Sequence, residues 1–283
     1  MSKHHSLRSL LGGTLLPLNE AKILLAFVLE KHYQLPRSAL LSHDDLQLNS
    51  EALQQWQDLE ARRLFGEPVA YLIGKKGFHE IELYIAPGVL IPRPETELLV
   101  EIALREIQKL GGQANVLDLG TGSGAIALAV AHAAPNTLVT ATDESLEALA
   151  IAKRNAEQLS LTPQVRFSQG SWYAALAGTT QFDVILSNPP YIAREDGHLL
   201  QGDLRFEPRT ALTDGASGLT CLETIIAQAD SHLKPGGVVA VEHGFDQSDA
   251  VVNLLKMANL QEIQVHQDLA GHDRVASGRK PMP

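Results

Sequence analysis

Cysteine is almost absent from this sequence of 283 residues, in which Cys221 stands alone. A single thiol can form neither an intrachain disulfide framework nor a cysteine-rich metal site. The eleven histidines also lack a ligand spacing such as His-x-x-x-His. We therefore predict no metal ion, and we expect a reducing, cytoplasmic setting.

Long apolar runs are missing as well. A transmembrane helix needs about 18–20 apolar residues in succession, and no segment of the chain approaches that length. The stretch "LLGGTLLPL" at 10–18 is faintly similar to a secretory signal, but two glycines interrupt it and no small-x-small cleavage site follows. We interpret it as a helix and a turn, and we predict no membrane span.

Repeats of a few tens of residues and segments of low complexity are also lacking, which excludes solenoid and disordered classes. Apolar residues make up 45% of the chain. A chain of this length and composition can fill the core of one large domain or of two ordinary ones.

Proteins that bind nucleic acid through its phosphates typically have an excess of positive charge. This chain has none. The formal charge is −10, and residues 1–80 hold nine Lys or Arg against nine Asp or Glu. This leaves fourteen basic residues against twenty-four acidic ones for the rest of the chain. The balance argues against direct nucleic acid binding.

The first 75 residues have the pattern of a helical domain. Asn19 is placed to cap one helix and Ser50 another, and apolar residues recur at helical spacing after each. A small bundle that buries these residues in its own core explains them better than a cofactor site. We predict a helical domain over 1–75 and a linker with short strands over 76–95.

From residue 96 onward, apolar strands alternate with helical patterns. Such alternation is typical of a mostly parallel sheet that is covered by helices on both faces. We therefore predict an α/β catalytic domain over 96–283, with a seven-stranded, mostly parallel, Rossmann-like sheet whose ligands bind at the carboxyl ends of the strands. The predicted strands are 116–119, 138–141, 165–167, 184–186, 238–241, 263–266 and 274–277, and the predicted helices are 96–110, 125–133, 145–158 and 219–233.

A glycine-rich loop, "GTGSG" at 120–124, separates the first of these strands from a helix. Its glycines allow a tight turn and a close approach of the backbone to a ligand, and the helix N-terminus adds free N–H groups. Asp143 ends the second strand, where a carboxylate can hold the two hydroxyls of a ribose. The competing interpretations are a helix N-cap for Asp143 and a purely structural turn for the loop. This pattern fits both NAD and S-adenosylmethionine.

The fourth strand ends abruptly in "SNPPYI" at 187–192. Two prolines fix the backbone there, so the segment forms a ledge on the same sheet edge as the glycine loop. Asn188 and the Pro189 carbonyl offer two acceptors, which suit a planar –NH2 group whose nitrogen is a poor nucleophile. Orienting that nitrogen against an electrophilic methyl needs fixed dipoles rather than a strong base. This chemistry favours S-adenosylmethionine over NAD; a rigid turn, with Asn188 bonding its own backbone, is the competing interpretation.

Six motifs cover nearly the whole chain: "DLGTGSG", "NPPY", "IPRPETE" (91–97), "GEPVAYLIG" (66–74), "EHG" (242–244) and "DLAGHDRV" (268–275). In this combination the sequence resembles the peptide chain release factor N5-glutamine methyltransferases, the PrmC/HemK family. The resemblance implies methyl transfer from S-adenosyl-L-methionine to the side-chain amide nitrogen of the glutamine in the Gly-Gly-Gln motif of class 1 release factors.

The resemblance also implies roles for individual residues. Asn188, Pro189 and Tyr191 are expected to be catalytic, and together with Pro190 they are expected to receive the glutamine. Trp172 is expected to bind the cofactor, and the competing role for it is that of a core aromatic. The expected cofactor-binding residues are Gly120, Thr121, Gly122, Ser123, Gly124, Asp143, Trp172 and Asn188.

Two other functions fit the same motifs. Adenine N6 and cytosine N4 are also conjugated amines, so an amino methyltransferase acting on RNA or DNA is one alternative. A noncatalytic, cofactor-binding partner of the translation machinery is the other. We expect residues 1–75 to help dock the protein substrate in the enzyme, because an extended protein needs contacts beyond one glutamine.

Several residues in and beside these motifs have no assigned role. We expect "IPRPETE" to form a wall of the pocket. The segment "RFEPRTAL" at 205–212 is placed to form a lid over the substrate, although Arg205 and Glu207 could equally form an exposed ion pair of little weight. The residues whose individual roles stay open are Arg93, Glu95, Arg205, Glu207 and Glu242.

Overall fold

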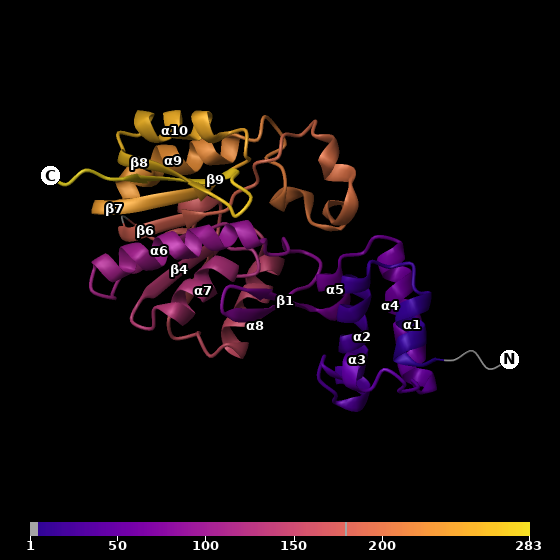
Figure 1. Cartoon of the computed structure of the whole chain (residues 1–283). Helices are drawn as coiled ribbons and strands as arrows, with labels where there is room; N and C mark the ends of the chain where they lie inside the picture. The colour runs from indigo at the N-terminus through magenta and orange to yellow at the C-terminus, as the bar shows by residue number, and fades with distance from the viewer. Residues whose placement is uncertain (1–4, 179) are drawn as a thin grey trace. The chain divides into compact units, whose positions relative to one another are not determined.

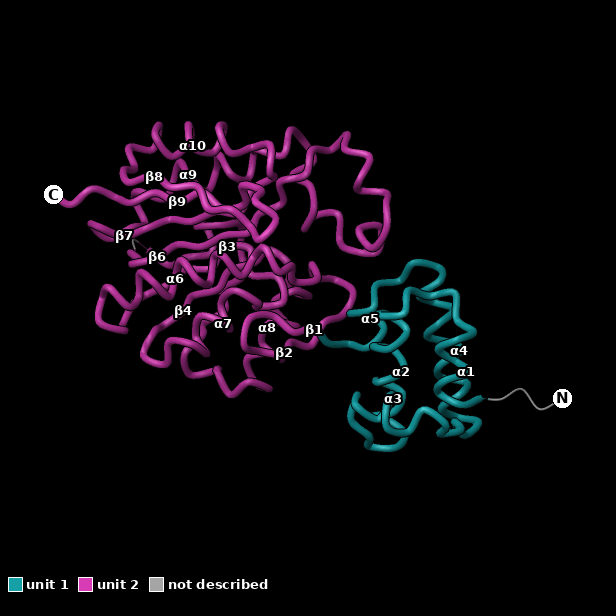
Figure 2. Tube along the Cα trace, viewed as in Figure 1, with its two compact units in different colours: residues 1–75 teal, residues 76–283 magenta. Residues whose placement is uncertain are grey.

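The computed structural model describes residues 5–178 and 180–283 of the chain. The chain divides into two compact units at Lys75 and Lys76 (Figure 2). The division coincides with the end of the predicted helical domain. The predicted linker, 76–95, belongs to the second unit rather than standing between the two.

The first unit consists of helices around a core of its own, with Trp56 and Leu59 among the buried side chains. Both predicted caps are wrong. The helix around Asn19 already begins at Leu18 after Pro17, and the cap of the next long helix is Asn49, whose side chain accepts a hydrogen bond from Ala52 N. Its helices are α1 (Leu7–Gly13), α2 (Leu18–Tyr33), α3 (Ala39–Ser42), α4 (Ser50–Leu64) and α5 (Val69–Ile73).

A seven-stranded sheet forms the centre of the second unit, in the order β5-β4-β3-β6-β7-β9-β8 (Figure 1). The first five strands of this order are parallel, and β9 runs antiparallel to both of its neighbours. The predicted sheet is thus confirmed, with each predicted strand inside an observed one. The strands are β3 (Asn115–Leu119), β4 (Leu138–Asp143), β5 (Val165–Gln169), β6 (Phe182–Ser187), β7 (Leu233–Glu242), β8 (Gln261–Gln267) and β9 (Asp273–Arg279).

Helices cover both faces of this sheet (Figure 1). Leu117, Ile185 and Val239 lie side by side on three neighbouring strands, and they pack against Ile225 of α9 and Val251 of α10. In the view of Figure 1 the helices α6, α7 and α8 lie on the other side of the sheet. The helix α10 was not predicted. The helices are α6 (Glu97–Lys109), α7 (Ala125–Ala133), α8 (Leu146–Gln158), α9 (Thr220–His232) and α10 (Ser248–Met257).

Short elements connect this framework. A two-stranded sheet, β1 (Lys75–Phe78) and β2 (Ile81–Tyr84), precedes the large one. Thr96 ends a 3-10 turn directly before α6, so this helix begins within one residue of the predicted start, and the Thr96 side chain makes no capping hydrogen bond. The short 3-10 helices are η1 (Pro94–Thr96), η2 (Trp172–Ala175), η3 (Gly197–Leu200), η4 (Gly202–Phe206) and η5 (Arg209–Ala211).

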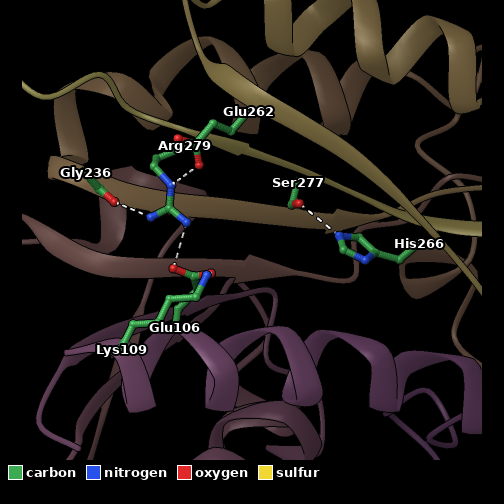
Figure 3. A network of polar contacts seen from close by, with 7 residues as sticks. All are labelled: Glu106, Lys109, Gly236, Glu262, His266, Ser277 and Arg279. Atoms are coloured by element: carbon green, nitrogen blue, oxygen red, sulfur yellow. Dashed lines mark hydrogen bonds and ion pairs between the residues drawn. The ribbon is translucent and has the colours of Figure 1, made fainter. Parts of the chain in front are cut away.

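The Arg279 guanidinium ties the last strand to three other segments (Figure 3). It donates to Glu262 at 2.8 Å, to the Gly236 carbonyl at 2.7 Å and to Glu106 of α6 at 2.9 Å. Lys109 also donates to Glu106. Burial alone would raise the pKa of Glu106, but the hydrogen bonds from Lys109 and Arg279 lower it below its usual value. The network fixes the end of β9 against α6 and β8.

Within the described residues, no helix is long and apolar enough to cross a membrane. The same residues contain no group of three His, Cys, Asp or Glu side chains that could hold a metal ion.

Candidate active site at the carboxyl edge of the sheet

The glycine loop connects β3 to α7 in a conformation that favours glycine. Gly120, Gly122 and Gly124 have φ values of 73°, 56° and 85°. A side chain on Gly124 would place its Cβ 2.9 Å from Leu128 of α7. At Gly122 the corresponding position faces open space. The loop therefore combines close packing against the helix at Gly124 with an unobstructed backbone at Gly122, where a ligand can approach.

Asp143 holds this loop from the tip of β4. Its Oδ2 accepts a hydrogen bond from Gly122 N at 2.9 Å, and its Oδ1 accepts one from Ser145 N at 2.9 Å. The competing interpretation of Asp143 as a helix cap is wrong, because the Ser145 side chain caps α8 by accepting from Ala148 N. Asp143 thus presents a carboxylate at the strand tip, beside the glycine backbone.

Asp118 lies beneath the loop and is fully buried. Its Oδ2 accepts hydrogen bonds from the Thr121 hydroxyl at 2.6 Å and from Ala127 N at 3.2 Å. Burial, opposed by these two bonds, raises the pKa of Asp118 to about 7. Asp118 therefore braces the loop against α7 from below.

The ledge at 187–192 lies next to the glycine loop, because β6 pairs in register with β3. Ser187 is opposite Leu119, and its hydroxyl donates to the Leu119 carbonyl at 2.7 Å. The ledge is also held at its far end. Gln247 Nε2 donates to the Tyr191 carbonyl at 3.0 Å, and a Cβ on Gly218 would lie 2.3 Å from that carbonyl oxygen.

Asn188 is oriented by a residue from another segment. Its Nδ2 donates to the hydroxyl of Thr96 at 3.1 Å. The side-chain oxygen of Asn188 is consequently the atom left to accept a hydrogen bond from a ligand. The competing interpretation placed this side-chain hydrogen bond on the backbone of Asn188 itself, whereas in the structure it is made to Thr96.

These segments meet around one cavity of about 570 Å³, which is within the size range of small-molecule sites. The pocket wall expected from "IPRPETE" is present in part, as Pro92 and Thr96 line the cavity. Gly124 and Pro189, and likewise Tyr191, lie outside the lining. The predicted site residues that line the cavity are Gly120, Thr121, Gly122, Ser123, Asp143, Trp172, Asn188 and Pro190.

Trp172 fits both roles that were weighed for it. Its indole lines the cavity and also packs against the buried core cluster that includes Leu117 and Ile185. A Cβ on Gly120 would lie 3.1 Å from the indole. Trp172 therefore lies over the start of the glycine loop, where a flat ring of a ligand could stack on it.

Tyr191 points away from the cavity lining toward a buried acid. Its hydroxyl donates to Glu242 Oε1 at 3.0 Å, and Glu242 is 1% exposed. Burial raises the pKa of Glu242 to about 7, against hydrogen bonding from Thr96 and Tyr191. Burial and the neighbouring Glu242 charge also raise the pKa of Tyr191 far above its usual value. Tyr191 therefore remains a neutral donor.

The segment 205–212 is anchored rather than free. Glu207 does not pair with Arg205 at the surface; its buried carboxylate accepts from Ile91 N at 2.9 Å and pairs with Arg93. Burial raises the pKa of Glu207, and the neighbouring Arg93 charge opposes the rise. The next residues, Pro208, Thr210 and Ala211, line the cavity. Glu207 thus joins two walls of the site.

Sequence reasoning assigned no role to three polar residues of this site. Thr96, Glu207 and Glu242 are buried, and each contacts a segment far away in the chain. The only local signal was their place inside "IPRPETE", "RFEPRTAL" and "EHG". A buried acid cannot be recognised from its neighbours in sequence when its partners are about 50 to 116 residues away.

Family models and a solved structure match large parts of the chain. Residues 94–203 match the family described as Methyltransferase small domain, and residues 7–74 match the PrmC N-terminal domain. A solved methyltransferase from Pyrococcus furiosus shares the fold at 21% identity and a TM-score of 0.54, over 80% of this chain and all of that one.

Closer relatives extend over nearly the full length. The release factor glutamine methyltransferase of Bordetella pertussis is 49% identical over 96% of this chain and 98% of the relative. The protein of the same name from Vibrio cholerae is 44% identical over 95% of this chain and 91% of the relative. Identity at this level over both units shows that the chain belongs to the release factor glutamine methyltransferase family.

Proposed function

We propose that this chain transfers a methyl group from S-adenosyl-L-methionine to the side-chain amide nitrogen of the glutamine in the Gly-Gly-Gln motif of class 1 peptide chain release factors. Membership of the family supports the reaction. One observation carries the site assignment. Asn188 lines the cavity of the glycine loop, and its Nδ2 donates to Thr96, so that Oδ1 is left to accept from a ligand. We place the reaction in the cytoplasm, where its substrate takes part in translation.

The cavity fits the cofactor. The unobstructed Gly122 backbone suits close contact with a ligand, and the Asp143 carboxylate suits the two hydroxyls of a ribose. The indole of Trp172 offers a flat face for the adenine. When bound, S-adenosylmethionine supplies an electrophilic methyl group. Gly120, Thr121, Ser123 and Gly124 complete the proposed cofactor site, with Gly124 acting by packing the loop against α7.

The chain's own residues position the nucleophile. An amide nitrogen is a weak nucleophile because its lone pair is conjugated, so orientation matters more than a strong base. Asn188 Oδ1 and the Pro189 carbonyl accept the two hydrogens of the glutamine –NH2. These dipoles also stabilise the positive charge that builds on nitrogen as the methyl group is transferred. Pro190 and Tyr191 keep the ledge in place, with Tyr191 anchored on Glu242.

Labelled cofactor and two release factors test the proposal. One has the Gly-Gly-Gln glutamine, and the other has glutamate or alanine in its place. We expect label, and a mass increase of one methyl group, only in the first. Asn188→Ala should lower kcat by about 100-fold and leave cofactor affinity largely unchanged. Equal labelling of both release factors would overturn the site of methylation, and salt-sensitive labelling of RNA or DNA alone would establish the nucleic acid alternative.

The helical unit is part of the proposal. We infer that residues 1–75 hold the protein substrate, since they form a unit with a core of its own. Removing them should raise KM for the intact release factor far more than KM for a short peptide that contains the glutamine. Equal changes for both substrates would contradict this role.

A further inference from the structure

Asn188, Thr96, Glu242 and Tyr191 form a connected polar group behind the ledge. The two ends, Asn188 and Tyr191, belong to the ledge itself, whereas Thr96 ends η1 and Glu242 ends β7. Asn188 Nδ2 donates to Thr96 at 3.1 Å, and the Tyr191 hydroxyl donates to Glu242 at 3.0 Å. Thr96 is also close enough to Glu242 for its hydroxyl to oppose the rise in the pKa of that carboxyl, and Glu242 Oε2 is buried without a hydrogen-bond partner among the described residues, so it offers a free acceptor. Three separate segments thus meet at one buried acid.

The direction of the hydrogen bonds follows from the chemistry of the groups. A threonine hydroxyl has one hydrogen to donate, and an ionised carboxylate can only accept. If the hydrogen of Thr96 is directed to Glu242, the hydroxyl oxygen can only accept from Asn188. Asn188 must then turn its –NH2 group toward Thr96 and its Oδ1 away from it.

The opposite orientation would disable the ledge. If Thr96 donated to the Asn188 oxygen, the amide would be flipped and would present –NH2 to the glutamine. Two –NH2 groups cannot hydrogen-bond each other well, because both are donors and their nitrogens are weak acceptors. A mechanism that holds the amide in one orientation is therefore a condition of substrate binding in the reactive pose.

We propose that Glu242 is a positioning residue that fixes the amide orientation of Asn188 through Thr96 and anchors the ledge through the Tyr191 hydroxyl. This inference rests on the proposed function of Asn188. The carboxylate touches neither substrate nor cofactor in this role. Glu242 is 1% exposed, and hydrogen bonds to its carboxylate, when it is ionised, are stronger away from water than they would be at the surface.

Variants of Thr96 separate this role from simple packing. Thr96→Val keeps the shape of the side chain but removes the hydroxyl, and Thr96→Ser keeps the hydroxyl. We expect Thr96→Val to lower kcat for release factor methylation by about 10-fold to 100-fold, with cofactor affinity within about threefold of the parent. Thr96→Ser should recover most of the lost kcat. Equal losses in both variants, or no loss in Thr96→Val, would overturn the inference.

Glu242→Gln gives the second arm of the test. The new –NH2 group can donate to Thr96, which permits Thr96 to donate to Asn188 and releases the amide. The expected result is a loss of kcat of the size seen in Thr96→Val, with no further loss when the two changes are combined. Additive losses would show that Glu242 acts independently of Thr96 and would overturn the pathway. Tyr191→Phe tests the other branch and should cost less than Glu242→Gln.

The experiment distinguishes this inference from the proposed function. Asn188→Ala is measured in the same assay. If Asn188→Ala retains full activity, the function of the ledge is wrong. If Asn188→Ala abolishes turnover while Thr96→Val and Glu242→Gln retain it, the ledge is correct and the positioning role is wrong. Thermal unfolding and cofactor binding of every variant show whether it is folded.

Discussion

The Glu207 carboxylate accepts a hydrogen bond from the backbone N–H of Ile91 over 2.9 Å and also pairs with Arg93. Ile91 and Glu207 are 116 residues apart in the chain, and the segments around both contribute to the wall of the same cavity. The segment after the ledge is therefore fixed to the segment before α6 by one buried acid.

Replacing Glu207 by Ala should loosen this wall. The change leaves Ile91 N–H without its partner and Arg93 without its counter-charge, so we expect a loss of about 1–3 kcal/mol in the free energy of unfolding. Cofactor affinity should fall as well. Glu207→Gln is the matched control, because it retains an acceptor for Ile91 and should retain more stability. Urea unfolding and calorimetric cofactor titration measure both effects; equal stability of Glu207→Ala and the parent would contradict the anchoring role.

Asp143→Asn should weaken cofactor binding by about 10-fold to 100-fold, since hydrogen bonds to a charged acceptor contribute about 1.5–3 kcal/mol. The asparagine oxygen can still accept from Gly122 N, so the loop should stay folded. Ser145→Ala serves as the control: it also changes a residue that lines the cavity and removes the cap of α8, at a cost of about 1 kcal/mol of stability, but it keeps the Asp143 carboxylate. A cofactor titration in which Ser145→Ala loses as much affinity as Asp143→Asn would exclude a direct role for Asp143.

Asp118 makes stability depend on pH in a defined direction. Its pKa is raised by burial to about 7 in the folded protein, above the value of the exposed side chain. Between about pH 4 and pH 7 the folded state therefore holds a proton that the unfolded state has released. The stabilisation by the protonated Asp118 side chain is fully present below about pH 4 and is lost as the pH rises through about 7. The difference in melting temperature between Asp118→Asn and the parent should accordingly move in favour of the variant from pH 5.5 to pH 8. A difference that is constant over this range would show that Asp118 is already ionised at the lower pH.

Glu242 gives methyl transfer a pH dependence. Its pKa is raised by burial to about 7, with Tyr191, Thr96, Glu95 and Arg274 as the facing groups. If the ionised form orients Thr96 and Asn188, kcat should rise as pH increases through about 7 and level off above it. Glu242→Gln should lower kcat and remove this limb of the profile. Retention of the same limb in Glu242→Gln would assign it to another group.

Arg279 links four segments of the chain away from the cavity (Figure 3). Arg279→Met keeps much of the apolar stem but removes the donors to Glu106, Glu262 and Gly236. We expect it to lower the free energy of unfolding by about 1–3 kcal/mol with little change in KM for the release factor. Because hydrogen bonding lowers the pKa of Glu106, the stabilisation by this acid is present near neutral pH and is lost as pH falls through that lowered pKa. The stability gap between the variant and the parent should therefore narrow in acid.

The sequence predicted the sheet better than it predicted the helix ends. The strands β3 and β6 and the second half of β7 are nearly continuous buried runs, because both faces of a parallel sheet are covered, and such runs are easily recognised. Caps depend on which of several adjacent polar residues reaches a backbone N–H. Asn49 and Ser50 are both suitable, and only the three-dimensional geometry selects Asn49.

The sequence by itself determined the alternation of strands and helices, the glycine loop, the carboxylate of Asp143 at the tip of β4, and the ledge at 187–192. These are local features, since each depends on residue types within a few positions of one another. Only the tertiary structure decided that Asn188 meets Thr96, that Tyr191 meets Glu242 and that Glu207 meets Ile91. The physical reason is that a buried polar group is stable only with a partner, and the partners here come from distant segments that the folded sheet brings to one edge.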